Sequence, residues 1–201
     1  MVINKVHHID AIHGLRTLED NTDSTTLKLY ERLFWNKGKG LSHPKRFGDK
    51  IEYLFWFAKT EKFTINIDEM RVPYSESSLK RFKKPIKKRF NRTEGDEKVE
   101  YKDWGPNPKG ALPSTLINIG SESRRISDNH IAVYPEHLTD YFIKGSTNEG
   151  DLVLDPFMGS GTTGVSAKKL KREWIGFDNI EEYVNFANKR IDSTKVNDKM
   201  S

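Results

Sequence analysis

The sequence predicts an α/β protein built on a mostly parallel sheet, and two observations carry this prediction. β-rich segments and helix-forming segments alternate at both ends of the 201-residue chain, which is typical of parallel sheets with crossover helices. Near the C-terminus, a short apolar strand runs directly into a glycine-containing loop, after which a helix begins. The length suits one domain, or one domain with a sizeable insertion.

The N-terminal part is expected to supply the first part of the sheet. Val2–Ile9 is rich in β-forming residues and is predicted to be a strand. We expect a short amphipathic helix over Asp10–Leu18, with Asp10 as its N-cap, and a second helix over Leu27–Phe34. The apolar run Ile51–Ala58 is predicted to be a buried strand.

Further along the chain, a loop-rich stretch separates this part from a second regular half. From residue 59 to residue 112 periodicity weakens and charge dominates, so we interpret this stretch as an insertion of loops and short elements. The elements expected after it are strands near Leu116–Ile119, Asp151–Leu154 and Glu173–Phe177 and helices over Pro135–Ile143, 161–171 and Glu181–Ile191. The predicted organisation is an N-terminal sheet part (1–58), the insertion (59–112), a second half (113–192) and a polar tail (193–201), with five or six strands in all.

Composition excludes several classes of site. The chain has no cysteine, which excludes disulfides, thiolate catalysis and cysteine-based zinc sites. The six histidines show no metal-ligand spacing, so no metal site is expected. No apolar leader follows Met1, and the longest apolar run is far too short to cross a bilayer. We therefore expect a cytoplasmic protein without a membrane partner, whose net charge of +5 permits a polyanionic partner.

The glycine loop and a downstream acid together indicate a cofactor site. The loop reads Asp155-Pro-Phe-Met-Gly159-Ser-Gly161-Thr-Thr163. Glycine permits close approach of the backbone to a ligand, and the start of the next helix offers free N–H groups. Asp178 ends the next strand 19 residues after Gly159, near the spacing expected of an acid that accepts ribose hydroxyls. An ordinary tight turn explains the glycines alone, but not the whole combination.

A phosphate-binding P-loop is the sharper alternative, and the residues exclude it. That motif requires lysine followed by serine or threonine after the second glycine. Here Gly161 is followed by Thr162-Thr163-Gly164. The pattern therefore favours an adenosyl cofactor.

The loop resembles the cofactor motif of β-class DNA amino-methyltransferases, the circularly permuted adenine-N6 and cytosine-N4 enzymes. His130–Leu138 resembles the segment that precedes this motif, Trp174–Asp178 resembles the strand that follows it, and His8-Ile9-Asp10 stands where the family has a Gly-Asp turn. The resemblance implies a Rossmann-like methyltransferase sheet and S-adenosylmethionine as cofactor. The cofactor-binding residues that it implies are Asp10 (adenine, unless it serves only as an N-cap), His130 (methionine wall), Asp178 (ribose), and Asp155, Phe157, Gly159, Ser160, Gly161, Thr162 and Thr163.

The catalytic motif of the resembled family is missing. In that family an Asp/Asn/Ser-Pro-Pro-Tyr/Trp/Phe motif orients the target amino group and stacks on the flipped base. The chain contains no Pro-Pro dipeptide, and the nearest imitation, Val72-Pro73-Tyr74, lacks the polar acceptor. We therefore assign no catalytic residue. The chain passes almost at once from the turn near Asp23 to segments that resemble the family's central strands, which indicates an internal deletion and an incomplete sheet.

A basic segment in the insertion is the candidate DNA contact. Lys80–Arg92 interleaves cations with Phe82 and Phe90, a composition that neutralises phosphates and can stack on bases. In the resembled family the target-recognition region has this position, although a solvated basic loop would have the same composition. The candidate residues are Lys80, Arg81, Lys83, Lys84, Lys87, Lys88, Arg89 and Arg92.

The sequence leaves three functions open. The first is a DNA amino-methyltransferase of restriction-modification or orphan type that acts on double-stranded DNA, with adenine-N6 favoured and activity impaired by the missing motif. The second is a catalytically inactive DNA- or cofactor-binding remnant or subunit. The third is a methyltransferase for RNA or a small molecule, which the basic insertion disfavours. A homodimer or a complementing subunit is a possible partner.

Overall fold

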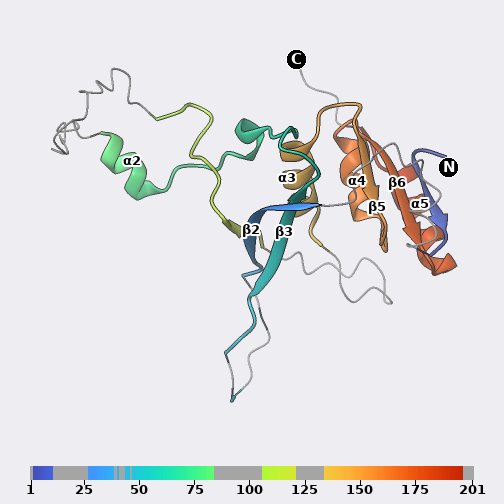
Figure 1. Cartoon of the computed structure of the whole chain (residues 1–201). Coiled ribbons are helices and arrows are strands. Elements are labelled where there is room, and N and C mark those ends of the chain that lie inside the picture. The colour runs from blue at the N-terminus through green and yellow to red at the C-terminus, as the bar shows by residue number, and fades with distance from the viewer. Residues whose placement is uncertain are drawn as a thin grey trace.

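The computed structural model describes residues 2–10, 27–38, 40, 44–45, 47–83, 106–120 and 134–196 (Figure 1). Its strands are β1 (Lys5–His8), β2 (Lys28–Asn36), β3 (Ile51–Ala58), β4 (Leu116–Asn118), β5 (Leu152–Asp155) and β6 (Glu173–Asp178). Its helices are the 3-10 helix η1 (Ile67–Met70) and the α-helices α2 (Glu76–Phe82), α3 (Glu136–Ser146), α4 (Thr162–Lys169) and α5 (Glu181–Asp192). The mixed α/β class predicted from the sequence is confirmed.

The first of two three-stranded sheets has the order β1-β6-β5, and all of its strands run parallel. β6 lies in the middle and is buried over most of its length, as expected for a parallel strand with neighbours on both sides. Val6, Val153 and Trp174 of this sheet form one apolar cluster with side chains of α4 and α5. These two helices therefore cover the same face of the sheet.

The second sheet has the order β3-β2-β4, with β2 antiparallel to β3 and parallel to β4. Leu33, Trp35 and Ile117 point to one face, where they pack against Leu138 of α3. The indole N–H of Trp35 donates to the carbonyl oxygen of Ile119 at 2.6 Å. Because its only polar atom is paired, this tryptophan is buried without an unsatisfied donor.

Helix α3 joins the two sheets (Figure 1). Its Leu138 belongs to the core of the second sheet, and its Ile143 belongs to the core of the first. The hydroxyls of Thr139 and Ser166 in α4 are hydrogen-bonded at 2.6 Å. The helix thus contacts both cores, and its start lies close to α4.

Within the loop-rich stretch 59–112, the chain leaves the fold at Val72 and returns to it at Ala111. Val72 and Ala111 form an antiparallel bridge, with N–H···O distances of 3.1 and 2.8 Å. Beside it, Arg71 Nη1 donates to the carbonyl oxygen of Gly110 at 2.8 Å. The described part beyond this bridge, including α2, projects away from both sheets (Figure 1). Among the described residues, no helix is both long enough and apolar enough to cross a membrane.

Three expectations about the N-terminal part need correction. The helix predicted over Leu27–Phe34 is wrong: β2 occupies this stretch, because alternate side chains face α3 and the backbone pairs with β3. Ile51–Ala58 is a strand, as predicted, but it is not buried on both faces, since Tyr53 and Phe55 are 69% and 55% exposed. The described residues form two sheets rather than one, because no described strand pairs with the outer edge of β5.

The elements predicted in the C-terminal half are confirmed. A strand, a helix, a strand and a helix follow one another from β5 to α5, and α3 begins directly after Pro135. Proline has no N–H to leave unpaired at a helix start, which is why it marks this boundary. Of the helix predicted over Asp10–Leu18, all but Asp10 lies outside the described residues.

Candidate cofactor site

Three parallel strands bring the predicted cofactor residues to one edge of the first sheet. His8 of β1 is level with Asp178 of β6, and Asp155 of β5 is level with Gly176 of β6. Asp10 follows β1 directly, and the preceding Ile9 donates its N–H to the Asp178 carbonyl oxygen at 2.9 Å. Ligands of open α/β sheets bind at this carboxyl edge. His130 lies outside the described residues.

The two glycines of the loop serve different purposes. Both have positive φ, +50° at Gly159 and +82° at Gly161, a region that side chains rarely adopt. A Cβ on Gly161 would lie 3.0 Å from the Cβ of Ala187 in α5 and 3.2 Å from Ile191 Cδ1, whereas a Cβ on Gly159 would meet only the Phe157 carbonyl oxygen at 3.9 Å. The loop is therefore pressed against α5 at Gly161 and open at Gly159.

Asp155 is the first residue of the loop, and its carboxylate stabilises the loop by accepting two hydrogen bonds. Its Oδ1 accepts the Phe157 N–H at 2.9 Å, and its Oδ2 accepts the Thr163 hydroxyl at 2.6 Å. One carboxylate thus joins the start of the loop to the first turn of α4. The Asp155 and Thr163 side chains therefore shape the loop internally.

Asp178, which the sequence predicts as the ribose-binding acid, lies against the loop. Its Oδ2 accepts the Gly159 N–H at 3.0 Å, and its Oδ1 accepts the Ile180 N–H at 2.9 Å. An ionised carboxylate has about four lone-pair sites, so acceptor capacity remains for a ribose hydroxyl. Phe157 is the most exposed large apolar side chain of the loop, at 78%.

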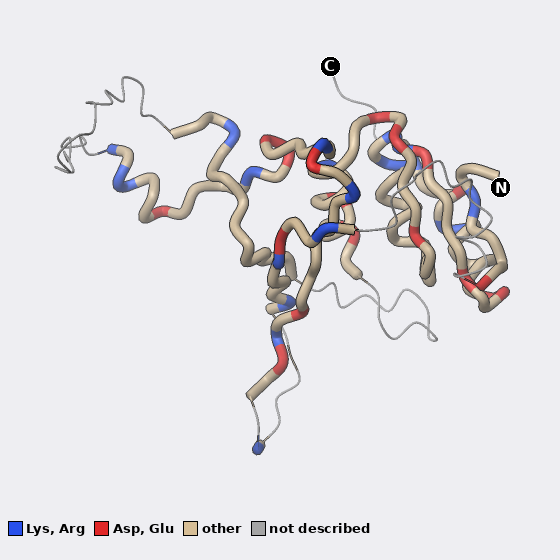
Figure 2. Tube along the Cα trace, in the orientation of Figure 1, with Lys and Arg blue, Asp and Glu red and all other residues tan. Residues whose placement is uncertain are grey.

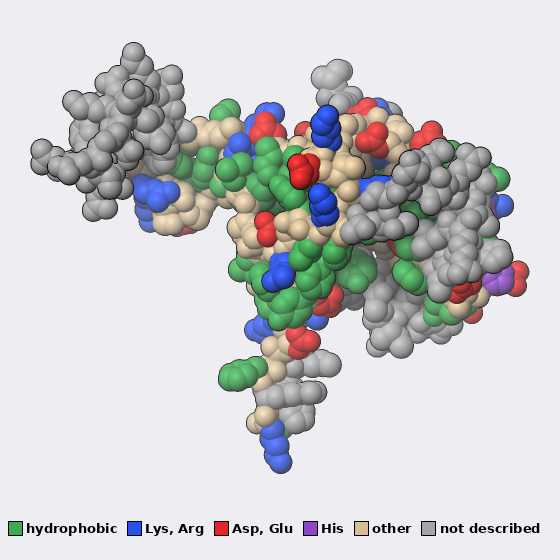
Figure 3. Space-filling view, in the orientation of Figure 1, with side chains coloured by type: hydrophobic (Ala, Val, Ile, Leu, Met, Phe, Trp, Pro, Cys, Tyr) green, Lys and Arg blue, Asp and Glu red, His purple; other side chains and the backbone are tan. Residues whose placement is uncertain are grey.

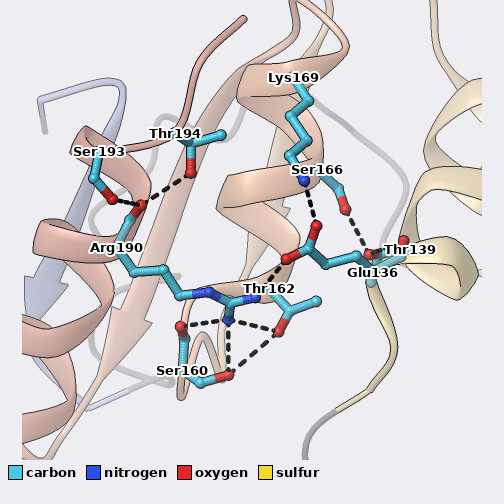
Figure 4. Close-up of polar contacts among 9 residues, drawn as sticks. All are labelled: Glu136, Thr139, Ser160, Thr162, Ser166, Lys169, Arg190, Ser193 and Thr194. Carbon is cyan, nitrogen blue, oxygen red and sulfur yellow. Dashed lines mark hydrogen bonds and ion pairs between the residues drawn. The ribbon is translucent and has the colours of Figure 1, made fainter. Parts of the chain in front are cut away.

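A partly buried arginine that sequence reasoning missed contacts the loop from α5 (Figure 4). Arg190 of α5 donates through Nη1 to the Ser160 carbonyl oxygen at 3.0 Å and to Thr162 Oγ1 at 3.1 Å. Its Nη2 donates to Glu136 Oε1 at 2.8 Å. The Ser160 and Thr162 side chains are buried, so these two predicted cofactor residues direct their hydroxyls toward Arg190.

Glu136 receives a second cation on its other oxygen. Lys169 Nζ of α4 donates to Glu136 Oε2, so one carboxylate connects α3 with α4 and α5. Burial alone would raise the pKa of Glu136, but the hydrogen bonds from Lys169 and Arg190 outweigh burial and hold that pKa below its usual value. The sequence signal for this cluster was a charged Arg190 beside Ala187 and Ile191 on the inward face of a predicted helix.

The candidate DNA-contacting residues are only partly described. Lys80 and Arg81 lie on α2 and Lys83 caps its end, and all three side chains are exposed (Figure 2). Phe82 packs edge-to-face on Tyr74 with ring centroids 5.0 Å apart. The residues that lie outside the described part are Lys84, Lys87, Lys88, Arg89 and Arg92.

Comparison with known proteins identifies a family. The model of the family N6_N4_Mtase, described as DNA methylase, matches residues 4–189. The chain is 37% identical over 171 residues to the type II methyltransferase M1.MboII of Moraxella bovis, covering 81% of this chain and 62% of that protein. It is 34% identical to the orphan methyltransferase M.BamHII of Bacillus amyloliquefaciens, covering 81% of this chain and 62% of that protein. The chain thus spans less than two thirds of the length of these relatives.

Solved structures agree with the fold. The M1.HpyAVI–S-adenosylmethionine complex is 26% identical, with a TM-score of 0.53 over 82% of this chain and 63% of that chain. The cytosine-N4-specific PvuII DNA methyltransferase is 23% identical, with a TM-score of 0.58 over 94% of this chain and 59% of that chain, a likeness of fold. The family model covers most of the sequence, so the chain belongs to the N6/N4 DNA amino-methyltransferases, a family whose cofactor is S-adenosylmethionine.

Proposed function

We propose that this chain binds S-adenosylmethionine and DNA as part of a restriction-modification or orphan methyltransferase. The reaction is transfer of the cofactor methyl group to an exocyclic amino group of a base. The single observation that carries the proposal is the meeting of the glycine loop, Asp178 and Asp10 at the carboxyl edge of three parallel strands. Adenine-N6 is the favoured target, and because one structural relative is named as cytosine-N4-specific, the test measures both products.

The chain alone is expected to bind the cofactor but to transfer methyl groups very weakly. It contains no Pro-Pro dipeptide that could form the family's catalytic loop. Alignment of donor and acceptor supplies roughly 7–11 kcal/mol of a barrier reduction, and without that loop the target amino group has no acceptor to orient it. The second candidate function, an inactive cofactor- and DNA-binding remnant, rests on the same absence.

The test combines calorimetric titration of S-adenosylmethionine with transfer of labelled methyl to plasmid DNA in one preparation. Binding without transfer is the expected result, and efficient transfer would contradict the impairment. Gly159→Ala is the loss-of-binding variant, because its methyl group would enter the open side of the loop. Gly150→Ala is its matched control, since Gly150 also has positive φ (+87°) and a Cβ there meets nothing within 4 Å. Equal affinity in both variants would contradict the proposed site.

Contact with double-stranded DNA is proposed through the exposed cations of the insertion. Lys80, Arg81 and Lys83 are expected to neutralise phosphates, so their joint replacement by glutamine lowers the slope of log affinity against log salt by roughly 3. Three exposed lysines outside the insertion, changed together to glutamine, provide the matched control for net charge: Lys5, Lys50 and Lys189. Equal slopes in the two triple variants would contradict a specific role for the insertion.

A complementing subunit is proposed to supply the missing strand. The outer edge of β5 has no partner strand among the described residues, and Leu152 and Leu154 on this strand are exposed. An added parallel strand that ends in the family's catalytic motif would pair there and restore alignment. Mixing the chain with a peptide fragment that contains the family's catalytic motif should raise methyl transfer by about tenfold or more. No gain from the fragment would contradict the complementing subunit. A homodimer, which sedimentation would detect, would not restore transfer, because the second copy also has no Pro-Pro dipeptide.

A further inference from the structure

We propose that Arg190 and Glu136 are positioning residues that hold the glycine loop in its cofactor-binding conformation. The inference deepens the proposed function and rests on the cofactor site described above. Neither residue belongs to the loop, and neither lies at the open side near Gly159. Arg190 contacts the backbone and hydroxyl groups of the loop from α5, and Glu136 contacts Arg190 from α3 (Figure 4).

The first step is that Arg190 fixes the turn between the two glycines. Its Nη1 contacts the Ser160 carbonyl oxygen at 3.0 Å, Thr162 Oγ1 at 3.1 Å and Ser160 Oγ at 3.4 Å. Its side chain is only 16% exposed, so water cannot readily replace these bonds. The N-cap of α4 is Gly161, which has no side chain to cap the helix. Arg190 only donates, so it does not cap the helix N–H groups; it stabilises the turn through the Ser160 carbonyl oxygen and the Thr162 hydroxyl.

The second step is that Glu136 fixes Arg190. Its Oε1 accepts from Arg190 Nη2 at 2.8 Å while its Oε2 accepts from Lys169. The guanidinium of Arg190 is paired with Glu136 through one nitrogen and hydrogen-bonded to the loop through the other. It therefore has little freedom to rotate. The carboxylate also neutralises part of the charge of two partly buried cations, Arg190 and Lys169.

The third step is that the network connects the loop to α3, which also packs against the second sheet. Glu136 is the first residue of α3, and Leu138 of the same helix lies in the core of the second sheet. A displacement of α3 would therefore move Glu136 and, through Arg190, the loop. Three elements separated in sequence thus set the shape of one cofactor-binding turn.

The experiment measures two properties of Arg190→Gln and Glu136→Gln. The first is amide hydrogen exchange over residues 157–164 without cofactor, which reports the loop itself. The second is the calorimetric affinity for S-adenosylmethionine. Loss of charged hydrogen bonds predicts exchange that is faster by about 10- to 100-fold and affinity that is weaker by a similar factor. Arg190→Lys should recover only part of each loss, because an ammonium cannot bond the loop and Glu136 through a planar fork.

Arg71→Gln is the matched control. Like Arg190, Arg71 joins a carboxylate to a backbone carbonyl: its Nε donates to Asp68 Oδ1 at 2.7 Å and its Nη1 to Gly110 at 2.8 Å. Its side chain is 12% exposed, yet it lies at the base of the insertion. This variant should change neither loop exchange nor cofactor affinity. A comparable loss in Arg71→Gln would mean that general destabilisation, not positioning, causes the effect.

The double variant tests whether the two residues act as one unit. If Glu136 works through Arg190, combining both changes should weaken affinity no more than Arg190→Gln alone. Additive losses would overturn the coupling. Unchanged loop exchange in Arg190→Gln would overturn the positioning role. If the unmodified chain fails to bind S-adenosylmethionine, the proposed cofactor function falls, and the exchange measurement still decides whether Arg190 holds the loop.

Discussion

The two sheets of this molecule differ in how far their polar side chains are hydrogen-bonded and their apolar side chains are covered. At the carboxyl edge of the first sheet, the Asp155, Asp178 and Arg190 side chains all bond within the loop region. The second sheet buries one face against α3 and exposes aromatic side chains on the other (Figure 3). A purely parallel sheet is normally covered on both faces, whereas a sheet with an antiparallel pair such as β2 and β3 can leave one face exposed.

The difference is between a stabilised loop on one sheet and an exposed apolar face on the other. The first sheet has helices on one face and a loop whose shape is set by residues of this chain. The exposed face of the second sheet carries Phe34, Tyr53, Phe55 and Phe57, large apolar groups that elsewhere would be covered. The chain spans 62% of the length of M1.MboII. The following predictions test this contrast, from the largest effect to the smallest.

Trp35→Ala should be the most damaging change. Trp35 is buried in the core of the second sheet, and its indole N–H is bonded to the carbonyl oxygen of Ile119. Removing a large buried aromatic side chain costs about 3–5 kcal/mol of unfolding free energy. Urea denaturation measures this loss, and a loss below about 1 kcal/mol would show that the second sheet is not a cooperative part of the fold.

Gly161→Ala should cost roughly 2–4 kcal/mol. The new side chain must tolerate φ of +82° and must also fit 3.0 Å from the Cβ of Ala187. Gly150 also has positive φ, but a Cβ there would contact nothing within 4 Å. Gly150→Ala should therefore lower the free energy of unfolding by only about 1 kcal/mol. Thermal unfolding of the two variants separates packing from backbone strain. Equal losses would mean that the contact between the loop and α5 is loose.

Glu136→Gln should destabilise the chain by about 1–3 kcal/mol at neutral pH, with a defined dependence on pH. The pKa of Glu136 is lower in the folded state than its ordinary value of 4.5. The ionised carboxylate therefore stabilises the fold fully above about pH 4.5, and this contribution is lost as pH falls through the lowered folded pKa. Unfolding curves of both proteins should converge in acid. A difference that stays constant from pH 7 to pH 3 would contradict the charged interaction.

Phe55→Ser should have the smallest effect on stability, within about 0.5–1 kcal/mol. Phe55 is 55% exposed on the uncovered face of β3. Its replacement should instead reduce self-association, which sedimentation at several concentrations would measure. A loss as large as that of Trp35→Ala would indicate that this face is covered in solution.

Sequence reasoning succeeded where the residues of a short segment determine its local structure. The strand, glycine loop, helix and acid from β5 to β6 follow from local chemistry and spacing, and the structure places Asp178 3.0 Å from the Gly159 N–H. It failed at Leu27–Phe34, where leucines and aromatics at spacings of two, three and four fit either a helix or a strand. Pairing with β3, which is distant in sequence, decided the outcome.

The rest of the site depended on contacts across the whole chain. Glu136 and Arg190 are 54 residues apart, and no local sequence pattern predicts the hydrogen bond between them. The hydroxyls of Ser160 and Thr162 were predicted as cofactor groups from the motif, yet both meet Arg190. Spacing predicts which residues lie near one another, but only packing determines which way their side chains point.

The bridge between Val72 and Ala111 has a consequence for evolution. Because both ends of the excursion meet at one pair of hydrogen bonds, changes of length inside it alter mainly the entropy of closing a loop. That cost grows by only about 0.6 kcal/mol for each doubling of length. The segment can therefore accept insertions, deletions and exchanged sequences while the sheets remain intact. A surface attached in this way can acquire new binding preferences by substitution and recombination much faster than the core beneath it can change.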